Sequence, residues 1–307
     1  MVVMKNRAAI LALVTAGSLW GINVALSKLS LRWLDPSWLT ALRFLVATPL
    51  LAIIARRGLR QAFTPRIFLS GAVGYGAVVL LQNVGIEHTS VSHGAIIVGA
   101  LPVVVALVAA TLGTGLARPL VWLGYAVALI GVVLVAKGGG GGATVFGDIL
   151  VFASVVLSGA TVAVQPSLLR GRDPAAVTAV QFFAAEVVSL PVALSQGALP
   201  HAPSAPGVVV AFLALAVVGT IVPFSLFAYG QARVAPELAG AFVNLEPLVG
   251  AVVGWIAFSN PVGGWQIFGA LTVVLGILVS LMPPDRGIGV PGLQRMIDAA
   301  VAGARRF

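Results

Sequence analysis

A glutamate, an asparagine and a proline interrupt the apolar segment AFVNLEPLVGAVVGW at residues 241–255. If this segment crosses a membrane, the carboxylate of Glu246 must face the interior of a helix bundle or an aqueous cavity, which makes it a functional candidate. It could bind a substrate amino group or take up a proton, and the alternative is a protonated structural group bonded to a neighbouring helix. Asn244 lies roughly 200° from Glu246 around an ideal helix. Both therefore face one narrow cavity only if the helix unwinds at Pro247.

Two prolines lie in the middle of apolar segments. Proline has no backbone N–H, so Pro247 leaves the carbonyl of Val243 without its helical partner, and Pro102 does the same for Val98. An unpaired carbonyl in lipid costs several kcal/mol and is tolerated only where it faces protein, water or ligand. We expect both prolines to lie near a binding site. The alternative is that they bend their helices to fit the bundle.

The composition is that of a membrane protein. Of the 307 residues 59% are hydrophobic and 9% are charged, whereas soluble domains carry about 25% charged residues. Apolar stretches of about 18 residues or more recur along the chain, which differs from the short alternating segments of outer-membrane barrels. The sequence predicts an all-α polytopic membrane protein. It has no cysteine, which excludes disulfides and thiol-bound metals.

Ten apolar spans can be marked, separated mostly by short connections. The glycine-rich segment KGGGGGA at 137–143 is predicted to be a flexible linker and falls after the fifth span. We expect a first unit at 1–136, a linker at 137–145, a second unit at 146–283 and a polar tail at 284–307. The predicted spans are 8–30, 37–55, 67–86, 92–112, 119–136, 146–168, 175–195, 207–230, 238–258 and 264–283.

The basic residues predict the orientation. Most of the 18 lysines and arginines fall on the side that holds the N-terminus, and cytoplasmic loops are enriched in such residues. We therefore expect both termini in the cytoplasm. The formal charge of +9 is spread over short loops between the spans, which argues against a nucleic-acid partner.

The two halves of the sequence repeat each other. Residues 19–36 align without gaps on 157–174, a shift of 138, and a shift of 145 aligns Pro102 with Pro247 further along. Because five spans per half is an odd number, the second half enters the membrane from the opposite side. Secondary transporters use such inverted repeats and hold the substrate near the midplane. The other repeated residues are Leu19, Gly21, Val24, Ala25, Arg32, Asp35, Pro36, Thr40, Ala41, Phe44, Gly124 and Gly131.

These residues resemble a known family. The segments LWGINVALSK and LTALRFLVA, followed by a proline within a span and by GYAVALIGVVLV or GALTVVLGILVS, are similar to the drug/metabolite transporter superfamily. The resemblance is to its ten-helix EamA branch, which includes exporters of the YddG kind, and it covers residues 8–283. It implies transport of a small molecule. One departure is that the loop ends of spans four and nine read LGTGLAR and FSNPVGG, without the acidic residue that members often carry there.

Several small polar and aromatic residues are predicted near mid-depth. Trp20 and Asn23 lie three residues apart on the first span, and Ser158 and Thr161 are their counterparts in the second half. Tyr75 of the third span lies at a similar depth. Such a set suits a small, partly apolar zwitterion. The alternative for each is ordinary hydrogen bonding between helices.

Three further charged residues lie within the spans. Lys28 and Arg43 are predicted near the outer face, where long side chains extend to the interface. Both could also line an outer vestibule and attract a carboxylate. Glu186 lies in the middle of the seventh span and could take part in coupling, with a structural role as the alternative.

The sequence favours a transporter over an enzyme. The segment EHTSVSH is not the zinc-binding H-E-x-x-H pattern, and we expect no catalytic residue, metal or cofactor. We predict a bacterial inner-membrane secondary transporter that exports amino acids or similar metabolites by alternating access. The alternatives are an exporter of drugs or cationic metabolites, a nucleotide-sugar-type carrier and, less favoured, a channel or a sensor. The partners would be the small-molecule substrate and the lipid bilayer.

Overall fold

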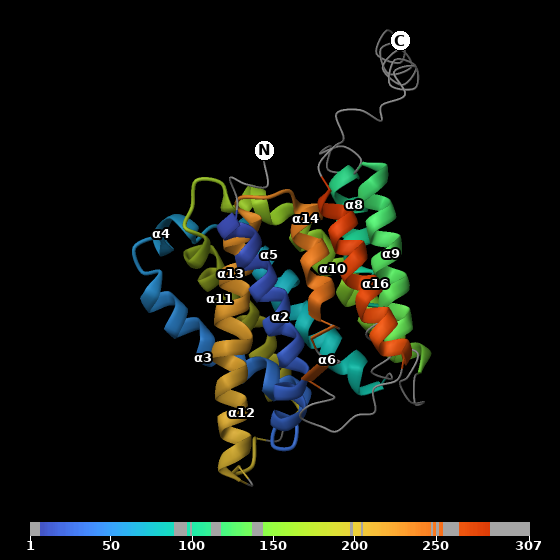
Figure 1. The fold of residues 1–307 in the computed structure, drawn as a ribbon. Coiled ribbons are helices and arrows are strands. Elements are labelled where there is room, and N and C mark those ends of the chain that lie inside the picture. Colours follow the sequence, from blue (N-terminus) through green and yellow to red (C-terminus); the bar gives the residue numbers. More distant parts are fainter. Residues whose placement is uncertain are drawn as a thin grey trace, which may run out of the picture.

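The computed structural model describes residues 7–88, 97–98, 100–111, 118–136, 144–196, 199–203, 205–246, 248–249, 252–253 and 264–282. Within these ranges the regular structure is helical, as predicted. The long helices run up and down beside one another in a single bundle (Figure 1). Pro247, the predicted linker at 137–143 and the tail at 284–307 lie outside the described residues.

The helices of the first half agree with the predicted spans to within a few residues, except in the fourth span, which is described only in part. The third span is divided by a π-helical segment, η1. These helices are α2 (Arg7–Ser30), α3 (Pro36–Ile54), the short α4 (Leu59–Ala62), α5 (Pro65–Gly71), η1 (Ala72–Ala77), α6 (Val78–His88), α8 (Leu101–Thr111) and α9 (Pro119–Ala136).

The second half repeats this order. Its third helix is again divided by a π-helical segment, η2, and its fourth contains a 3₁₀ segment, η3. The elements are α10 (Val145–Leu169), α11 (Pro174–Ser195), α12 (Pro206–Ala216), η2 (Val217–Ile221), α13 (Val222–Gln231), α14 (Pro236–Ala241), η3 (Phe242–Asn244) and α16 (Gly264–Leu281). Six described helical segments are long and apolar enough to cross a membrane, so the count of ten stays a prediction.

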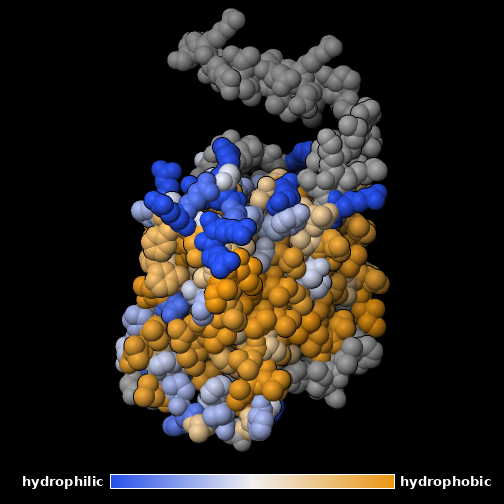
Figure 2. Space-filling view, turned by 90° about the vertical axis from the view of Figure 1, so that its left-hand side faces the viewer, coloured by the Kyte–Doolittle hydropathy of each residue, from blue (hydrophilic) through white to orange (hydrophobic). Residues whose placement is uncertain are grey.

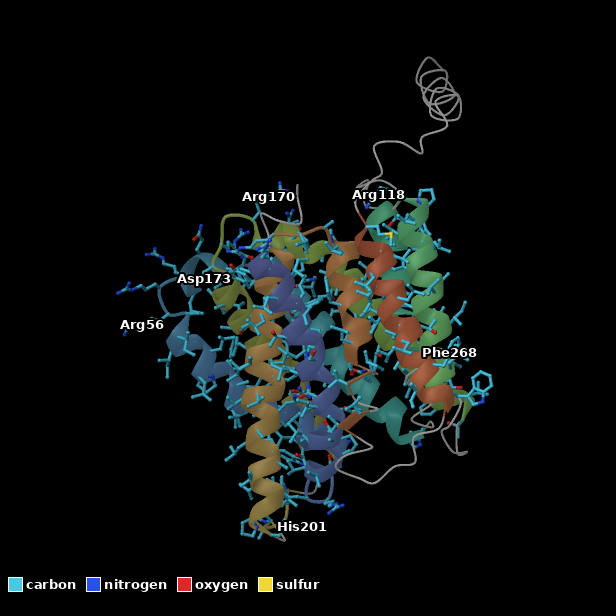
Figure 3. The ribbon with its side chains drawn as sticks, in the orientation of Figure 1. Arg56, Arg118, Arg170, Asp173, His201 and Phe268 are labelled. Atoms are coloured by element: carbon cyan, nitrogen blue, oxygen red, sulfur yellow. The ribbon has the colours of Figure 1, made fainter. Side chains whose placement is uncertain are left out.

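The surface has the pattern of a membrane protein. On the face shown in Figure 2 an apolar band crosses the middle of the molecule, and hydrophilic side chains gather most densely at one end. Arg118 and Arg170 lie at the end where α2 begins and α16 finishes, whereas His201 lies at the opposite end (Figure 3). The basic end is therefore the end that the positive-inside rule assigns to the cytoplasm.

The repeat found in the sequence begins corresponding helices in the same way. Asp35 caps α3 by accepting hydrogen bonds from the backbone N–H groups of Ser37 and Trp38, at 3.1 and 3.0 Å. Asp173 caps α11 through the N–H of Ala175 at 3.0 Å. Each cap is followed by proline, whose missing N–H is not needed in the first turn of a helix. The match between residues 19–36 and 157–174 thus includes a shared helix start.

Corresponding residues also meet across the centre of the bundle. α3 packs along α11, and the rings of Phe44 and Phe182, which are equivalent in the repeat, lie 5.3 Å apart. At the edge of the bundle α9 packs along α16 (Figure 1). A Cβ atom at Gly124 would lie 2.7 Å from the carbonyl oxygen of Gly276, so only glycine allows this approach. The described contacts therefore agree with two related repeats.

Candidate functional site

The two π-helical segments occupy equivalent positions in the two repeats. η1 begins at Ala72 and η2 begins at Val217, a separation of 145 residues, which is the shift that relates the later parts of the halves. A π turn adds one residue to a helix and leaves backbone groups without their regular partners, and such turns are frequent at functional sites. The segments therefore mark a pair of candidate positions within the third span of each repeat.

Two of the predicted site residues contact these segments. The Nδ2 of Asn23 on α2 donates a hydrogen bond of 2.7 Å to the carbonyl oxygen of Gly219 in η2. A Cβ atom at Gly219 would collide with the Asn23 side chain, and a Cβ atom at Gly74 in η1 would collide with Thr161 of α10. Asn23 and Thr161 are equivalent residues, as are Gly219 and Gly74, so one contact occurs in both repeats.

An aromatic cluster lies between the halves. We use this name for Trp20, Phe44, Tyr75, Phe182, Phe224 and Phe227, which come from α2, α3, η1, α11 and α13. Phe224 joins the members: its ring lies 5.1 Å from Trp20, 5.0 Å from Tyr75 and 5.6 Å from Phe182. The predicted candidates Trp20 and Tyr75 are thus brought together through a residue of the eighth span.

Polar atoms around this cluster are buried without partners. They are the Nε1 of Trp20, the Oδ1 of Asn23 and the hydroxyl of Ser225, the residue after Phe224. A buried polar atom that loses its hydrogen bond costs about 1–3 kcal/mol, so such atoms are expected to meet water or a ligand. One donor, one acceptor and one hydroxyl in an aromatic setting can bind a small solute that is partly polar and partly apolar.

Arg43 lies inside the protein rather than at the interface. Its side chain is 6% exposed, and its Nε and Nη2 donate hydrogen bonds of 3.1 and 2.9 Å to the hydroxyl of Thr220 in η2. That hydroxyl donates in turn to the carbonyl oxygen of Leu215 at 2.8 Å. The expectation that Arg43 extends to the interface is therefore wrong. Its side chain instead reaches the π segment next to Gly219, the residue that Asn23 contacts.

Glu246 lies close enough to Arg43 for their charges to interact. It is half-buried and lies two residues after the end of η3, the 3₁₀ segment that ends at Asn244. Asn244 is buried, with 2% of its surface exposed. A 3₁₀ segment turns the chain more tightly than an α-helix, so the ninth span departs from regular helical geometry next to Glu246. The structure therefore brings the acidic candidate of the second half towards the basic candidate of the first.

Pro102 and Ser158 have other surroundings. Pro102 is buried in the first turn of α8, where a missing N–H is not needed. The preceding turn is closed by a hydrogen bond of 3.1 Å from the N–H of Ala100 to the carbonyl of Ile97. Residues 97–98, before this turn, are helical as well, so the position of Pro102 in the middle of the fourth span stays a prediction. Ser158 is half-buried on α10.

Glu186 and Lys28 have no contact in the described structure with the unpartnered atoms of Trp20, Asn23 and Ser225. Glu186 is half-buried on α11, near Thr48 of α3, its equivalent in the repeat, whose hydroxyl is buried without a hydrogen-bond partner. Lys28 lies in the last turn of α2, and its side chain is outside the described part of the structure. The geometry thus gives Glu186 a place at the contact between α3 and α11.

Sequence reasoning missed Thr220, Phe224 and the buried pair of Gln165 and Gln181. The two glutamine side chains exchange hydrogen bonds of 3.0 and 2.7 Å. The repeat in the sequence pointed to two of these residues. The shift of 138 aligns Arg43 with Gln181, and the shift of 145 aligns Tyr75 with Thr220. Extending the repeat through the third and eighth spans would have identified these polar positions.

The fold and the contacts define a multi-pass helical membrane protein of two related repeats. The sequence pattern of the EamA-like transporter family matches residues 7–137 and again 145–282. The chain belongs to this family and is a membrane transporter of the drug/metabolite transporter superfamily.

Its relatives carry names of the same kind. An uncharacterized transporter of Archaeoglobus fulgidus is 24% identical, with 85% of this chain and 93% of the relative covered. The uncharacterized inner membrane transporter YedA of Escherichia coli K12 is 26% identical, with 85% of each chain covered. A solved structure titled "Crystal structure of protein" has a TM-score of 0.77 at 20% identity and covers 90% of this chain and 96% of its own, which supports the fold.

Proposed function

We propose that this transporter is a secondary carrier that exports amino acids or similar small metabolites across a bacterial inner membrane. It would work by alternating access between its two repeats, and both termini would lie in the cytoplasm. The observation that carries the proposal is the aromatic cluster with its unpartnered polar atoms at Trp20, Asn23 and Ser225. These groups lie where both repeats contribute residues, the region in which such carriers hold their substrates.

The proposed path of the solute follows the symmetry of the contacts. Asn23 on Gly219 and Thr161 on Gly74 are equivalent contacts, and in an inverted repeat one belongs nearer the outer side and the other nearer the inner side. We propose that the two contacts separate in turn, each opening the cluster to one side. Residues 1–136 and 146–283 would be the two moving units.

A second candidate is an exporter of broader specificity for drugs or cationic metabolites. The aromatic cluster and Glu246 favour it, because aromatic faces and carboxylates both attract cations. Arg43 argues against it, since a buried guanidinium repels a cationic solute. We therefore place zwitterionic solutes before cationic ones.

The test is a solute panel with the purified protein in liposomes. We expect saturable exchange of at least one of the amino acids and no such exchange in empty liposomes. A flux that rises linearly with concentration would indicate a channel, and binding without flux would indicate a sensor. Saturable exchange of cationic drugs alone would favour the second candidate.

Access to the site can be measured independently, because the chain has no native cysteine. Tyr75 and Asn244 are 5% and 2% exposed, so single cysteines there should react slowly with a water-soluble thiol reagent. We expect the rate to change when the transported solute is added, because alternating access alters their exposure. Rates that stay the same with and without solute at Asn23, Tyr75 and Asn244 would place the pathway elsewhere.

A further inference from the structure

Arg43 and Glu246 break the symmetry of the two repeats. Gln181 stands at the position equivalent to Arg43, and Leu101 at the position equivalent to Glu246. The two charges come from opposite halves, one from α3 and one from the residues after η3. The first repeat thus supplies a positive group and the second repeat a negative group, each without a charged counterpart at the equivalent position.

The guanidinium of Arg43 retains binding capacity. Both hydrogen bonds that the structure assigns to it go to the hydroxyl of Thr220, although a guanidinium has five N–H donors. A hydroxyl carries no charge, so the compensating charge is that of Glu246, which acts through space. Buried charges need such compensation. The remaining N–H groups are therefore available to the anionic group of a solute.

We propose that Arg43 recognises the carboxylate of an amino-acid substrate and that Glu246 recognises its ammonium group. The proposal rests on the transport function proposed above and specifies how that site selects its solute. Arginine matches the geometry of a carboxylate with two parallel hydrogen bonds. A zwitterion also adds no net charge to the buried site. When the site is empty, the charges of Arg43 and Glu246 compensate each other. When the solute is bound, its carboxylate compensates Arg43 and its ammonium group compensates Glu246.

The unpartnered atoms nearby have the polarity that this orientation needs. The Oδ1 of Asn23 is an acceptor that can take an N–H of the ammonium group, and the Nε1 of Trp20 is a donor that can bind the carboxylate. Asn23 is held through its Nδ2 by Gly219, next to Thr220. The aromatic cluster then surrounds the solute side chain. Recognition of the polar end and of the apolar end thus uses neighbouring parts of one site.

The test compares three competitors of labelled L-leucine uptake in liposomes: unlabelled L-leucine, 3-methylbutylamine, which lacks the carboxylate, and 4-methylpentanoate, which lacks the amine. If the solute panel shows that another amino acid is transported best, the three competitors are that amino acid, its analogue without the carboxylate and its analogue without the amine. Arg43→Gln should weaken competition by the acid about ten- to a hundredfold and should not weaken competition by the amine, because the repulsion of an ammonium group by the guanidinium is lost. Glu246→Gln should weaken competition by the amine and should not weaken competition by the acid.

Two variants control for folding and for charge. Arg43→Lys keeps the positive charge but loses the geometry that forms two parallel hydrogen bonds with a carboxylate. The variant should fold like the parent, and competition by the acid should be several-fold weaker. Arg32→Gln removes an exposed positive charge after α2 and should leave all three competitors unchanged.

The outcomes separate the two proposals. A parent protein that takes up no amino acid contradicts the proposed function and this inference with it. A parent that takes up an amino acid, with Arg43→Gln and Arg43→Lys both competing like the parent, overturns the inference and leaves the function standing. Equal weakening of the acid and the amine by Arg43→Gln also overturns it, because Arg43 would then act only on the shape of the site.

Discussion

At the scale of single residues, Thr220 joins three elements through one hydroxyl group. Its oxygen accepts from Arg43 of α3 while its proton goes to the carbonyl of Leu215, five residues earlier, across the π turn. A hydroxyl has one proton to donate and two lone pairs to accept, so these contacts use its capacity fully. Thr220 is fully buried, which means that water does not replace a contact that is lost.

We expect Thr220→Val to lower the free energy of unfolding by about 1–3 kcal/mol, because the substitution keeps the shape and leaves buried groups without a partner. Thr220→Ser keeps the hydroxyl and is the matched control. The measurement is thermal unfolding of the purified protein in detergent. A valine variant as stable as the serine variant would show that Arg43 finds another acceptor.

The effects on stability of removing the charge of Arg43 and that of Glu246 should depend on each other. Arg43→Gln leaves the carboxylate of Glu246 without compensation, and Glu246→Gln does the same to the guanidinium, so each should destabilise the protein. The double variant removes both charges. We expect it to be more stable than the sum of the single effects by about 0.5–3 kcal/mol, measured by the same unfolding assay. Strictly additive effects would mean that the two groups do not interact.

At the scale of elements, the sequence predicted most helices and missed their irregular segments. Apolar runs such as 119–136, which is also the extent of α9, are long and uninterrupted, and length with apolarity is enough to predict a span. The π segments η1 and η2 have no proline at their start and no polar run, so neither composition nor periodicity indicates them. They follow from tertiary contacts, in which Asn23 and Thr161 pack on glycines of the widened turn.

We expect Gly219→Ala to destabilise the protein by about 1–3 kcal/mol, since the added methyl group collides with Asn23. Gly207→Ala is the control, because nothing lies within 4 Å of a Cβ atom there. That change should be neutral or stabilising by up to about 1 kcal/mol. The same melting temperature in both variants would show that the contact between α2 and η2 is loose.

The candidate site was predictable in its members but only partly in its geometry. Trp20, Asn23, Tyr75 and Glu246 were identified from polarity and mid-span position. The side chain of Arg43 was assigned to the interface, because its distance from the helix end permits that and because the acceptor on Thr220 is 177 residues away in the sequence. Contacts between distant segments depend on packing, which one sequence does not specify.

At the scale of the whole molecule, the repeat and the basic end predict the topology. The family pattern ends at residue 137 and begins again at residue 145, and α9 ends and α10 begins at the end opposite to the start of α2 (Figure 1). We expect reporter fusions at residue 307 and within 137–143 to lie on opposite sides of the membrane, with residue 307 in the cytoplasm. Both reporters on one side would contradict the five-plus-five arrangement.

The hydrogen bond between Arg43 and Thr220 also has a consequence for biosynthesis. The ribosome completes α3 long before η2, and at about 5–20 residues per second the 177 residues between the two partners take roughly ten to thirty seconds. During this interval the guanidinium must remain in contact with water or lipid head groups, because an unpaired charge in lipid is costly. We therefore expect the side chain of Arg43 to reach its final position only when the eighth span arrives, so that this part of the first half is completed after the second half has been made.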